Sequence, residues 1–188
     1  MALLRPDLVA SAALVAGYGR QNTIDRILQD AWQCLDDAGP DLDPVRLALL
    51  ALTSHPPHAL GDDAYLDPLV DGMRHWSAET DGPGDSRRRA RAFIDSYRDR
   101  LPALAGIRVP CLVMGFELDA DTFVVRAREV AAAIPASRYV ELPSAGHLTP
   151  VTAPEQVAGP VVRFFDEVEA GPPGAAGNAT SPRRGASP

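Results

Sequence analysis

The sequence has few cysteines and no long apolar segment, and these two absences exclude several classes of protein. Its 188 residues include only 2 cysteines, Cys34 and Cys111, too few for a disulfide framework. We expect both to be small buried side chains in a reducing compartment. No run of about 20 apolar residues could cross a bilayer, and Asp7 interrupts the apolar start of the chain, unlike the core of a secretion signal. We therefore expect a cytoplasmic protein without a membrane partner.

The sequence also has no excess of basic residues and none of the motifs that hold a cofactor. The formal net charge is -7 and the sequence pI is about 5.0, which argues against a nucleic-acid partner. A phosphate-binding glycine motif is missing, so we expect no nucleotide cofactor. His55 and His58 lie in a proline-rich turn without an accompanying cluster of Cys, Asp or Glu. We expect a surface turn there and no metal site.

Three apolar segments have the pattern of strands that are buried on both faces of a parallel sheet. They cover Leu8–Val15, Cys111–Phe116 and Tyr139–Leu142. A helical pattern over residues 121–134 separates the last two, and the spacing matches one βαβ unit of about 30 residues. The sequence therefore predicts an α/β fold with parallel strands.

The segment between the first and second strands, about residues 20–100, has a helical pattern. Gly and Pro residues and the turn at 55–58 divide it into four helices, the last over residues 86–100. We expect an all-helical insertion between two strands. A final helix starts at Pro154, and residues 171–188 are rich in Gly, Pro, Ala and Ser, which predicts a disordered tail. The predicted organisation is one domain over residues 1–170 followed by the tail.

Two residues suited to acid–base chemistry follow the second and third predicted strands. Asp119 comes just after one strand, and His147 follows the next in the segment Ala145-Gly146-His147, where the glycine would allow a tight turn or a positive φ. The carboxyl ends of neighbouring parallel strands meet at one edge of a sheet, where α/β folds place their sites. Glu117 and Asp121 lie on the same loop and remain alternatives for the acid, and Asp121 could instead cap the next helix.

Together these segments resemble the C-terminal half of an α/β-hydrolase. The resemblance rests on residues 107–115, Asp119, residues 139–147 and the helix that starts at Pro154. In that family the acid follows the seventh strand and the catalytic histidine follows the eighth. The resemblance therefore implies His147 as the general base and Asp119 as the residue that orients it. It also implies that the helical insertion is the family's variable cap and that the substrate is a small acyl compound, which the sequence does not identify.

The family's nucleophile is missing from this sequence. Its motif is G-x-S-x-G, and no such pentapeptide occurs here. The resemblance implies ester or thioester hydrolysis by a nucleophile–His–Asp triad, of which this chain would supply two members. The expected fold is thus a partial α/β-hydrolase fold, a three-stranded parallel remnant of the sheet flanked by helices. We expect a truncated hydrolase, from a gene fragment, a split gene or a misplaced start codon, that is inactive alone.

A protein of another class remains an alternative. If the first strand of this chain is the family's sixth, it lacks the neighbour that pairs with it in the complete fold. The apolar edge formed by Ala10–Ala16 would then be unpaired, and such an edge invites pairing with another chain. The alternative is a non-catalytic interaction protein, or a subunit that a partner chain completes.

Overall fold

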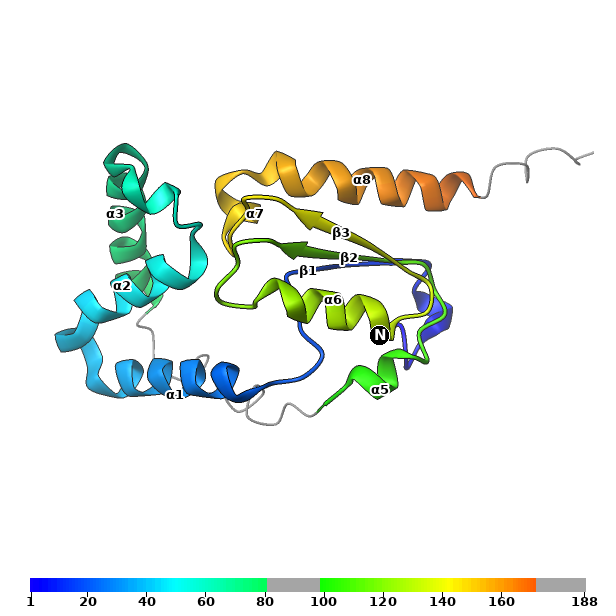
Figure 1. The fold of residues 1–188 in the computed structure, drawn as a ribbon, viewed down its shortest axis with the longest axis horizontal. Coiled ribbons are helices and arrows are strands. Elements are labelled where there is room, and N and C mark those ends of the chain that lie inside the picture. Colours follow the sequence, from blue (N-terminus) through cyan, green and yellow to red (C-terminus); the bar gives the residue numbers. More distant parts are fainter. Residues whose placement is uncertain (81–98, 172–188) are drawn as a thin grey trace, which may run out of the picture.

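The computed structural model describes residues 1–80 and 99–171 of the chain. Three strands form a parallel sheet in the order β1-β2-β3, as predicted (Figure 1); they are β1 (Ala12–Val15), β2 (Cys111–Phe116) and β3 (Ser137–Leu142). In the register of the sheet, Val113 of β2 lies between Leu14 and Tyr139. The central strand β2 is buried at all six residues, which explains its continuous apolar sequence.

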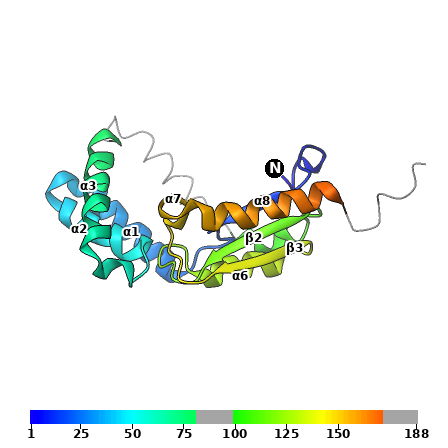
Figure 2. The same ribbon diagram turned by 90° about the horizontal axis from the view of Figure 1, so that it is seen from above.

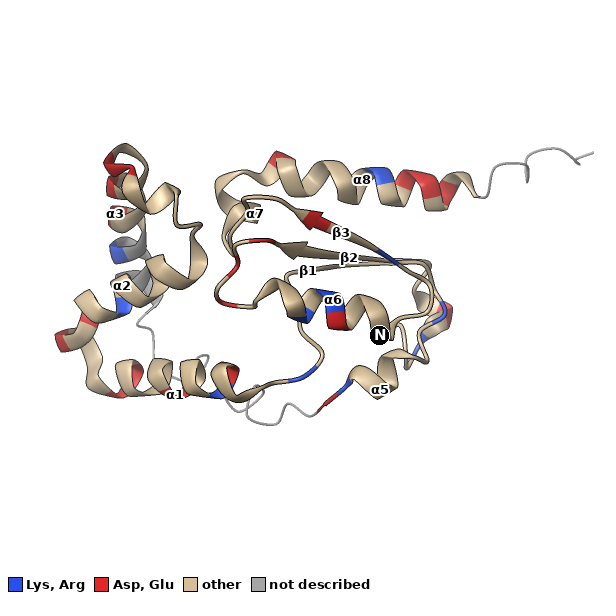
Figure 3. Ribbon diagram, in the orientation of Figure 1, with Lys and Arg blue, Asp and Glu red and all other residues tan. Residues whose placement is uncertain are grey.

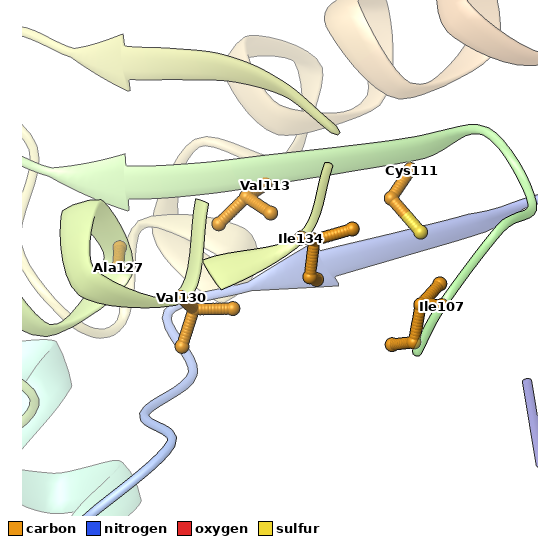
Figure 4. Close-up of a cluster of buried hydrophobic side chains, with 6 residues drawn as sticks. All are labelled: Ile107, Cys111, Val113, Ala127, Val130 and Ile134. Carbon is orange, nitrogen blue, oxygen red and sulfur yellow. The ribbon is translucent and has the colours of Figure 1, made fainter. Parts of the chain in front are cut away.

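Two helices cover opposite faces of this sheet, α6 (Val124–Ala133) on one face and α8 (Pro154–Ala170) on the other (Figure 1). Side chains of successive strand residues alternate between the faces. Cys111 and Val113 belong to a buried cluster with the α6 residues Ala127 and Val130 (Figure 4). The alternate residues of β2 point to the other face and pack against α8. This second cluster contains Leu112, Met114 and Phe116 of β2 and Val157 and Phe164 of α8. The core therefore consists of two apolar layers, one on each side of the sheet.

Gly115 of β2 allows α6 to lie close to the sheet. A Cβ atom at this position would be 2.7 Å from the hydroxyl oxygen of Tyr139 and 3.0 Å from Cβ of Ala127. A larger residue would therefore push α6 away from β2, the strand that leads into the loop carrying Asp119.

The insertion between β1 and β2 begins with three helices, which lie beyond the carboxyl ends of the strands (Figures 1 and 2). They are α1 (Thr23–Ala38), α2 (Asp43–Ser54) and α3 (Asp63–Thr80), joined by the short helices η2 (Gly39–Leu42) and η3 (Ala59–Gly61). Asn22 starts α1 with a capping box, in which its side chain accepts from the N–H of Asp25 and the Asp25 carboxylate accepts from the N–H of Asn22. The helix predicted over residues 86–100 and the predicted disordered tail fall almost entirely outside the described residues.

Several details differ from the sequence-based expectations, among them the start of β3 at Ser137 and not at Tyr139. β1 begins at Ala12 and not at Leu8, because Pro6–Leu8 forms the short helix η1 and Leu8 is 60% exposed. Helix α6 begins at Val124 and not at residue 121. Cys111 is buried as predicted, but Cys34, in α1, is exposed. Helices α5 (Leu101–Leu104) and α7 (Thr149–Thr152) were not anticipated.

None of the helices within the described residues is long and apolar enough to cross a membrane.

Candidate active site

Two loops meet at the carboxyl edge of the sheet, the β2–α6 loop and the β3–α7 loop. The backbone N–H of Glu117 donates to the carbonyl oxygen of Leu142 at 3.1 Å, and that of Leu118 donates to the carbonyl oxygen of Ala145 at 2.9 Å. These bonds continue the pairing of β2 with β3 past the ends of the strands. Acidic residues colour the β2–α6 loop red in Figure 3. The loop that carries the predicted acid is therefore fixed against the loop that carries the predicted histidine.

Asp119 and His147 are in contact across these loops. Nδ1 of His147 lies 3.0 Å from Oδ2 of Asp119. The Asp119 side chain is only 1% exposed, whereas that of His147 is 30% exposed. The other carboxylate oxygen of Asp119, Oδ1, accepts from the backbone N–H groups of Asp121 at 2.9 Å and Thr122 at 2.8 Å. The carboxylate is thus held on one side by its own loop and presents its second oxygen to the imidazole.

This contact determines which nitrogen of His147 carries the proton. An ionised carboxylate can only accept, so Nδ1 donates to Asp119 and, in the neutral ring, Nε2 is the unprotonated nitrogen. The hydrogen bond to Asp119 raises the pKa of His147, although burial acts in the opposite direction. Oγ1 of Thr122 also lies 3.2 Å from Nδ1. Thr122 and Asp119 thus both lie at Nδ1 and leave Nε2 on the other side of the ring.

The two alternative acids lie at other positions around the pair. Oε2 of Glu117 accepts from the backbone N–H of Ser144 at 2.8 Å, where the backbone φ is 56°. Oδ2 of Asp121 lies 3.4 Å from Nε2 of His147, on the side of the ring opposite Asp119. Asp121 does not cap α6, because Phe123 with φ 49° occupies the N-cap position and no side chain bonds there. Of the three acids, Asp119 alone contacts Nδ1 among the described residues.

Gly146 allows the histidine loop to approach the base of the helical insertion. Its φ is not positive, contrary to one of the two expectations for this glycine. A Cβ atom there would lie 2.8 Å from Cδ of Pro56 and 2.9 Å from the carbonyl oxygen of Ser54. The same carbonyl accepts from the backbone N–H of Leu148 at 3.0 Å. The end of α2 therefore holds the segment on both sides of His147.

His55 lies at this junction and is buried, so the prediction of a surface turn is wrong for this residue. It is 1% exposed, and its Nδ1 lies 2.7 Å from the hydroxyl oxygen of Tyr65. Burial lowers the pKa of His55. Sequence spacing gave no sign of this contact, since Tyr65 belongs to a separate helix. Within the part of the chain that the structure describes, no group of three or more His, Cys, Asp or Glu residues could hold a metal ion.

A cavity of about 320 Å³ lies beside the histidine loop, between the η3 region and helices α7 and α8. Tyr65, Ser144 and Thr149 are among the residues that line it, whereas Asp119 and His147 are not. The cavity therefore adjoins the acid–histidine pair without containing it.

Comparison with known proteins shows which fold this geometry belongs to. No protein-family model matches the chain. The chain is 34% identical over 171 residues to BpoC of Mycobacterium tuberculosis, which is named as a non-heme bromoperoxidase. The crystal structure of BpoC superimposes with a TM-score of 0.76, at 32% identity, and the match covers 88% of this chain. Its fold is that of part of an α/β-hydrolase.

Two further structures support the α/β-hydrolase fold at lower identity. MGS-M2, an α/β hydrolase from a deep-sea metagenome library, matches with a TM-score of 0.76 at 16% identity, over 88% of this chain and 59% of its own. The enol-lactonase of Burkholderia xenovorans matches with a TM-score of 0.64 at 22% identity, over 88% of this chain and 60% of its own. At these identities the likeness concerns the fold alone. The fold is therefore a partial α/β-hydrolase fold, as predicted.

The alignment with BpoC covers 89% of this chain but only 63% of BpoC. The match to the BpoC crystal structure likewise covers 61% of that chain. The chain thus spans less than two thirds of the length of this relative.

Proposed function

We propose that this chain carries the acid–base part of an acyl-hydrolysis site, with His147 as the general base and Asp119 as the residue that orients it. The observation that supports this most directly is the 3.0 Å contact between Nδ1 of His147 and a buried oxygen of Asp119. In such a site the carboxylate holds the ring in one tautomer and stabilises the imidazolium that forms when Nε2 accepts a proton. The partial exposure of His147 leaves a side from which a reacting group can approach.

We further propose that the nucleophile comes from outside this sequence. The chain has no G-x-S-x-G pentapeptide. Among the described residues, the ionisable side chain that contacts Nε2 is that of Asp121, and a carboxylate has no hydroxyl proton that His147 could remove. Thr122 has a hydroxyl group, but it lies at Nδ1. The shorter length relative to BpoC is consistent with this proposal. The isolated chain would then have no hydrolase activity of its own.

The substrate class that fits these groups is a small acyl compound, an ester, a thioester or a lactone. In each of them a carbonyl carbon is attacked by a nucleophile that has lost its proton to a base such as His147. The names of the structural neighbours include a lactonase, which supports this class without choosing among its members.

Hydrolysis of p-nitrophenyl acetate tests the proposed function in two steps. The purified chain should release p-nitrophenol no faster than free imidazole at the same concentration. A fusion of the chain to the part of BpoC that the alignment leaves uncovered should turn the ester over. That activity should disappear in His147→Ala and fall by about 10³–10⁴-fold in Asp119→Asn. Faster hydrolysis by the chain alone, lost in His147→Ala, would contradict the proposal of an external nucleophile.

A second candidate function is that of an interaction protein, and the edge of the sheet favours it. β1 pairs with β2 on one side, and no strand among the described residues pairs with its other side. An unpaired strand edge offers N–H and C=O groups to another chain. We propose that the segment Ala10–Ala16 binds a strand of a second chain or of a second copy. Sedimentation velocity should show concentration-dependent association, and a monodisperse monomer that melts cooperatively would count against it.

A further inference from the structure

Asp121 lies on the reacting side of His147. Its Oδ2 is 3.4 Å from Nε2, whereas Asp119 is bound at Nδ1 on the other side of the ring. The imidazole is therefore between two carboxylates that come from the same loop, two residues apart. Since Nδ1 donates to Asp119, Nε2 is the nitrogen that a base must keep free for a proton.

The carboxylate of Asp121 has no structural task that would explain its position. It does not cap α6, whose N-cap is Phe123. The turn of the loop is held by Asp119, which accepts from two backbone N–H groups, one of them that of Asp121 itself. Among the described residues, the Asp121 side chain forms an ion pair with His147 alone. The side chain is 37% exposed, so it can also turn away.

The charges around Asp121 make the imidazolium its main source of stabilisation. Burial raises the pKa of Asp121, and the carboxylates of Asp119 and of Asp25 on α1 act in the same direction, whereas His147 lowers it. Arg126 on α6 faces Asp25, with 3.6 Å between Nε and Oδ2, and pairs with Glu129. The charged form of Asp121 is thus favoured when His147 is protonated and disfavoured when it is neutral.

We propose that Asp121 is a positioning residue of the site, a second carboxylate that holds the protonated His147 at Nε2 in the resting state and must release it before the ring can act as a base. This inference rests on the proposed function, because only a general base has to free its Nε2. It assigns Asp121 a task that differs from that of Asp119, which keeps its contact throughout the reaction. The consequence is a resting site that is biased towards the imidazolium.

The ¹H–¹³C resonance of the His147 Cε1–H group, followed against pH in the full chain, tests the inference. Asp121→Asn should lower the pKa of His147 by about 0.5–1 unit, because one anion is removed from a partly exposed contact. Asp121→Glu, which keeps the charge, should retain at least part of the elevation. Asp71→Asn is the matched control, since Asp71 is an exposed acid paired with Arg74, and it should cause no shift.

The outcome for Asp119→Asn separates this inference from the proposed function. If Asp119→Asn lowers the pKa of His147 and Asp121→Asn does not, the inference fails and the proposed function stands. If Asp119→Asn causes no shift, the proposed function fails.

A second measurement uses the unmodified chain and therefore tests the inference even if the Asp121 variants do not fold. The ¹³C resonance of the Asp121 carboxyl should show a step at the pKa of His147, and its absence would overturn the inference.

Discussion

At the scale of single residues, His147 is the centre of the site, because each of its ring nitrogens faces a different acid. Asp119 is buried and fixed by backbone N–H groups, whereas Asp121 is partly exposed and has no such support. Because only Asp119 is fixed by backbone N–H groups, its contact with His147 is permanent, whereas the contact of Asp121 can be released. The sequence indicated Asp119 and His147 from their places after neighbouring strands.

The pH dependence of stability should show opposite contributions from His147 and His55. The pKa of His147 is raised in the folded chain, so its contribution is complete below the unfolded value of about 6.5 and is lost as the pH rises through the folded pKa. Burial lowers the pKa of His55, so its contribution is present above about pH 6.5 and is lost as the pH falls.

Urea unfolding of two variants at pH 5.5 and 8.5 measures these contributions. The loss of unfolding free energy in His147→Gln should be larger at the lower pH. The loss in His55→Gln should be larger at the higher pH. Equal losses at both pH values in either variant would contradict the assigned direction of that pKa shift.

Several residue-scale features could not be predicted, because they depend on contacts between distant segments. His55 is buried through its contact with Tyr65, and no local pattern distinguishes it from the exposed His58 in the same turn. The position of Asp121 at Nε2 depends on the turn that Asp119 imposes on its own loop. The sequence shows that Asp121 lies close to Asp119. It does not show that the Asp121 side chain faces Nε2 of His147.

At the scale of elements, the site depends on how the ends of β2, β3 and α2 meet. The strands were predictable from continuous apolar runs, and β2 has the predicted bounds. The start of α6 was not predictable. The N–H groups of residues 121 and 122 donate to Asp119 and form a turn first, and Phe123 follows with a positive φ. The same bonds delay the helix and position the acid. A local departure from the regular pattern thus coincides with the candidate site.

Gly146→Ala should destabilise the chain by about 1–3 kcal/mol, because the new Cβ would meet the backbone of Ser54 and the ring of Pro56. Gly61→Ala is the matched control, since nothing lies within 4 Å of a Cβ at that position, and its effect should stay within about 0.5 kcal/mol. Chemical denaturation measures both. Equal stability of the two variants would show that α2 does not hold the histidine loop.

At the scale of the whole molecule, the sheet is the feature that links fold to function. The loops that follow β2 and β3 carry the acid and the histidine, and the β1 edge is unpaired among the described residues. Resemblance to a family allowed the partial fold to be predicted, because the order of strands and loops is distinctive. The helical insertion gave no indication of a substrate, because its sequence pattern reflects only packing.

Proline substitutions in β1 should distinguish pairing at the open edge from pairing with β2. The N–H groups of Ala12 and Ala16 donate to residues next to and within β2, so by alternation that of Ala13 points to the open edge and that of Leu14 to β2. Ala13→Pro should reduce association in sedimentation velocity and keep the folded CD spectrum. Leu14→Pro should lose the fold. Undiminished association in a folded Ala13→Pro chain would exclude this edge as the interface.

The central claim is that Asp119 keeps the proton of the neutral His147 ring on Nδ1, so that Nε2 is the unprotonated nitrogen. Long-range ¹H–¹⁵N correlation of the His147 ring, at a pH well above its pKa, tests it directly in the full chain. The account predicts the neutral Nδ1–H tautomer, with loss of that preference in Asp119→Asn. A proton on Nε2 in the unmodified chain would contradict it.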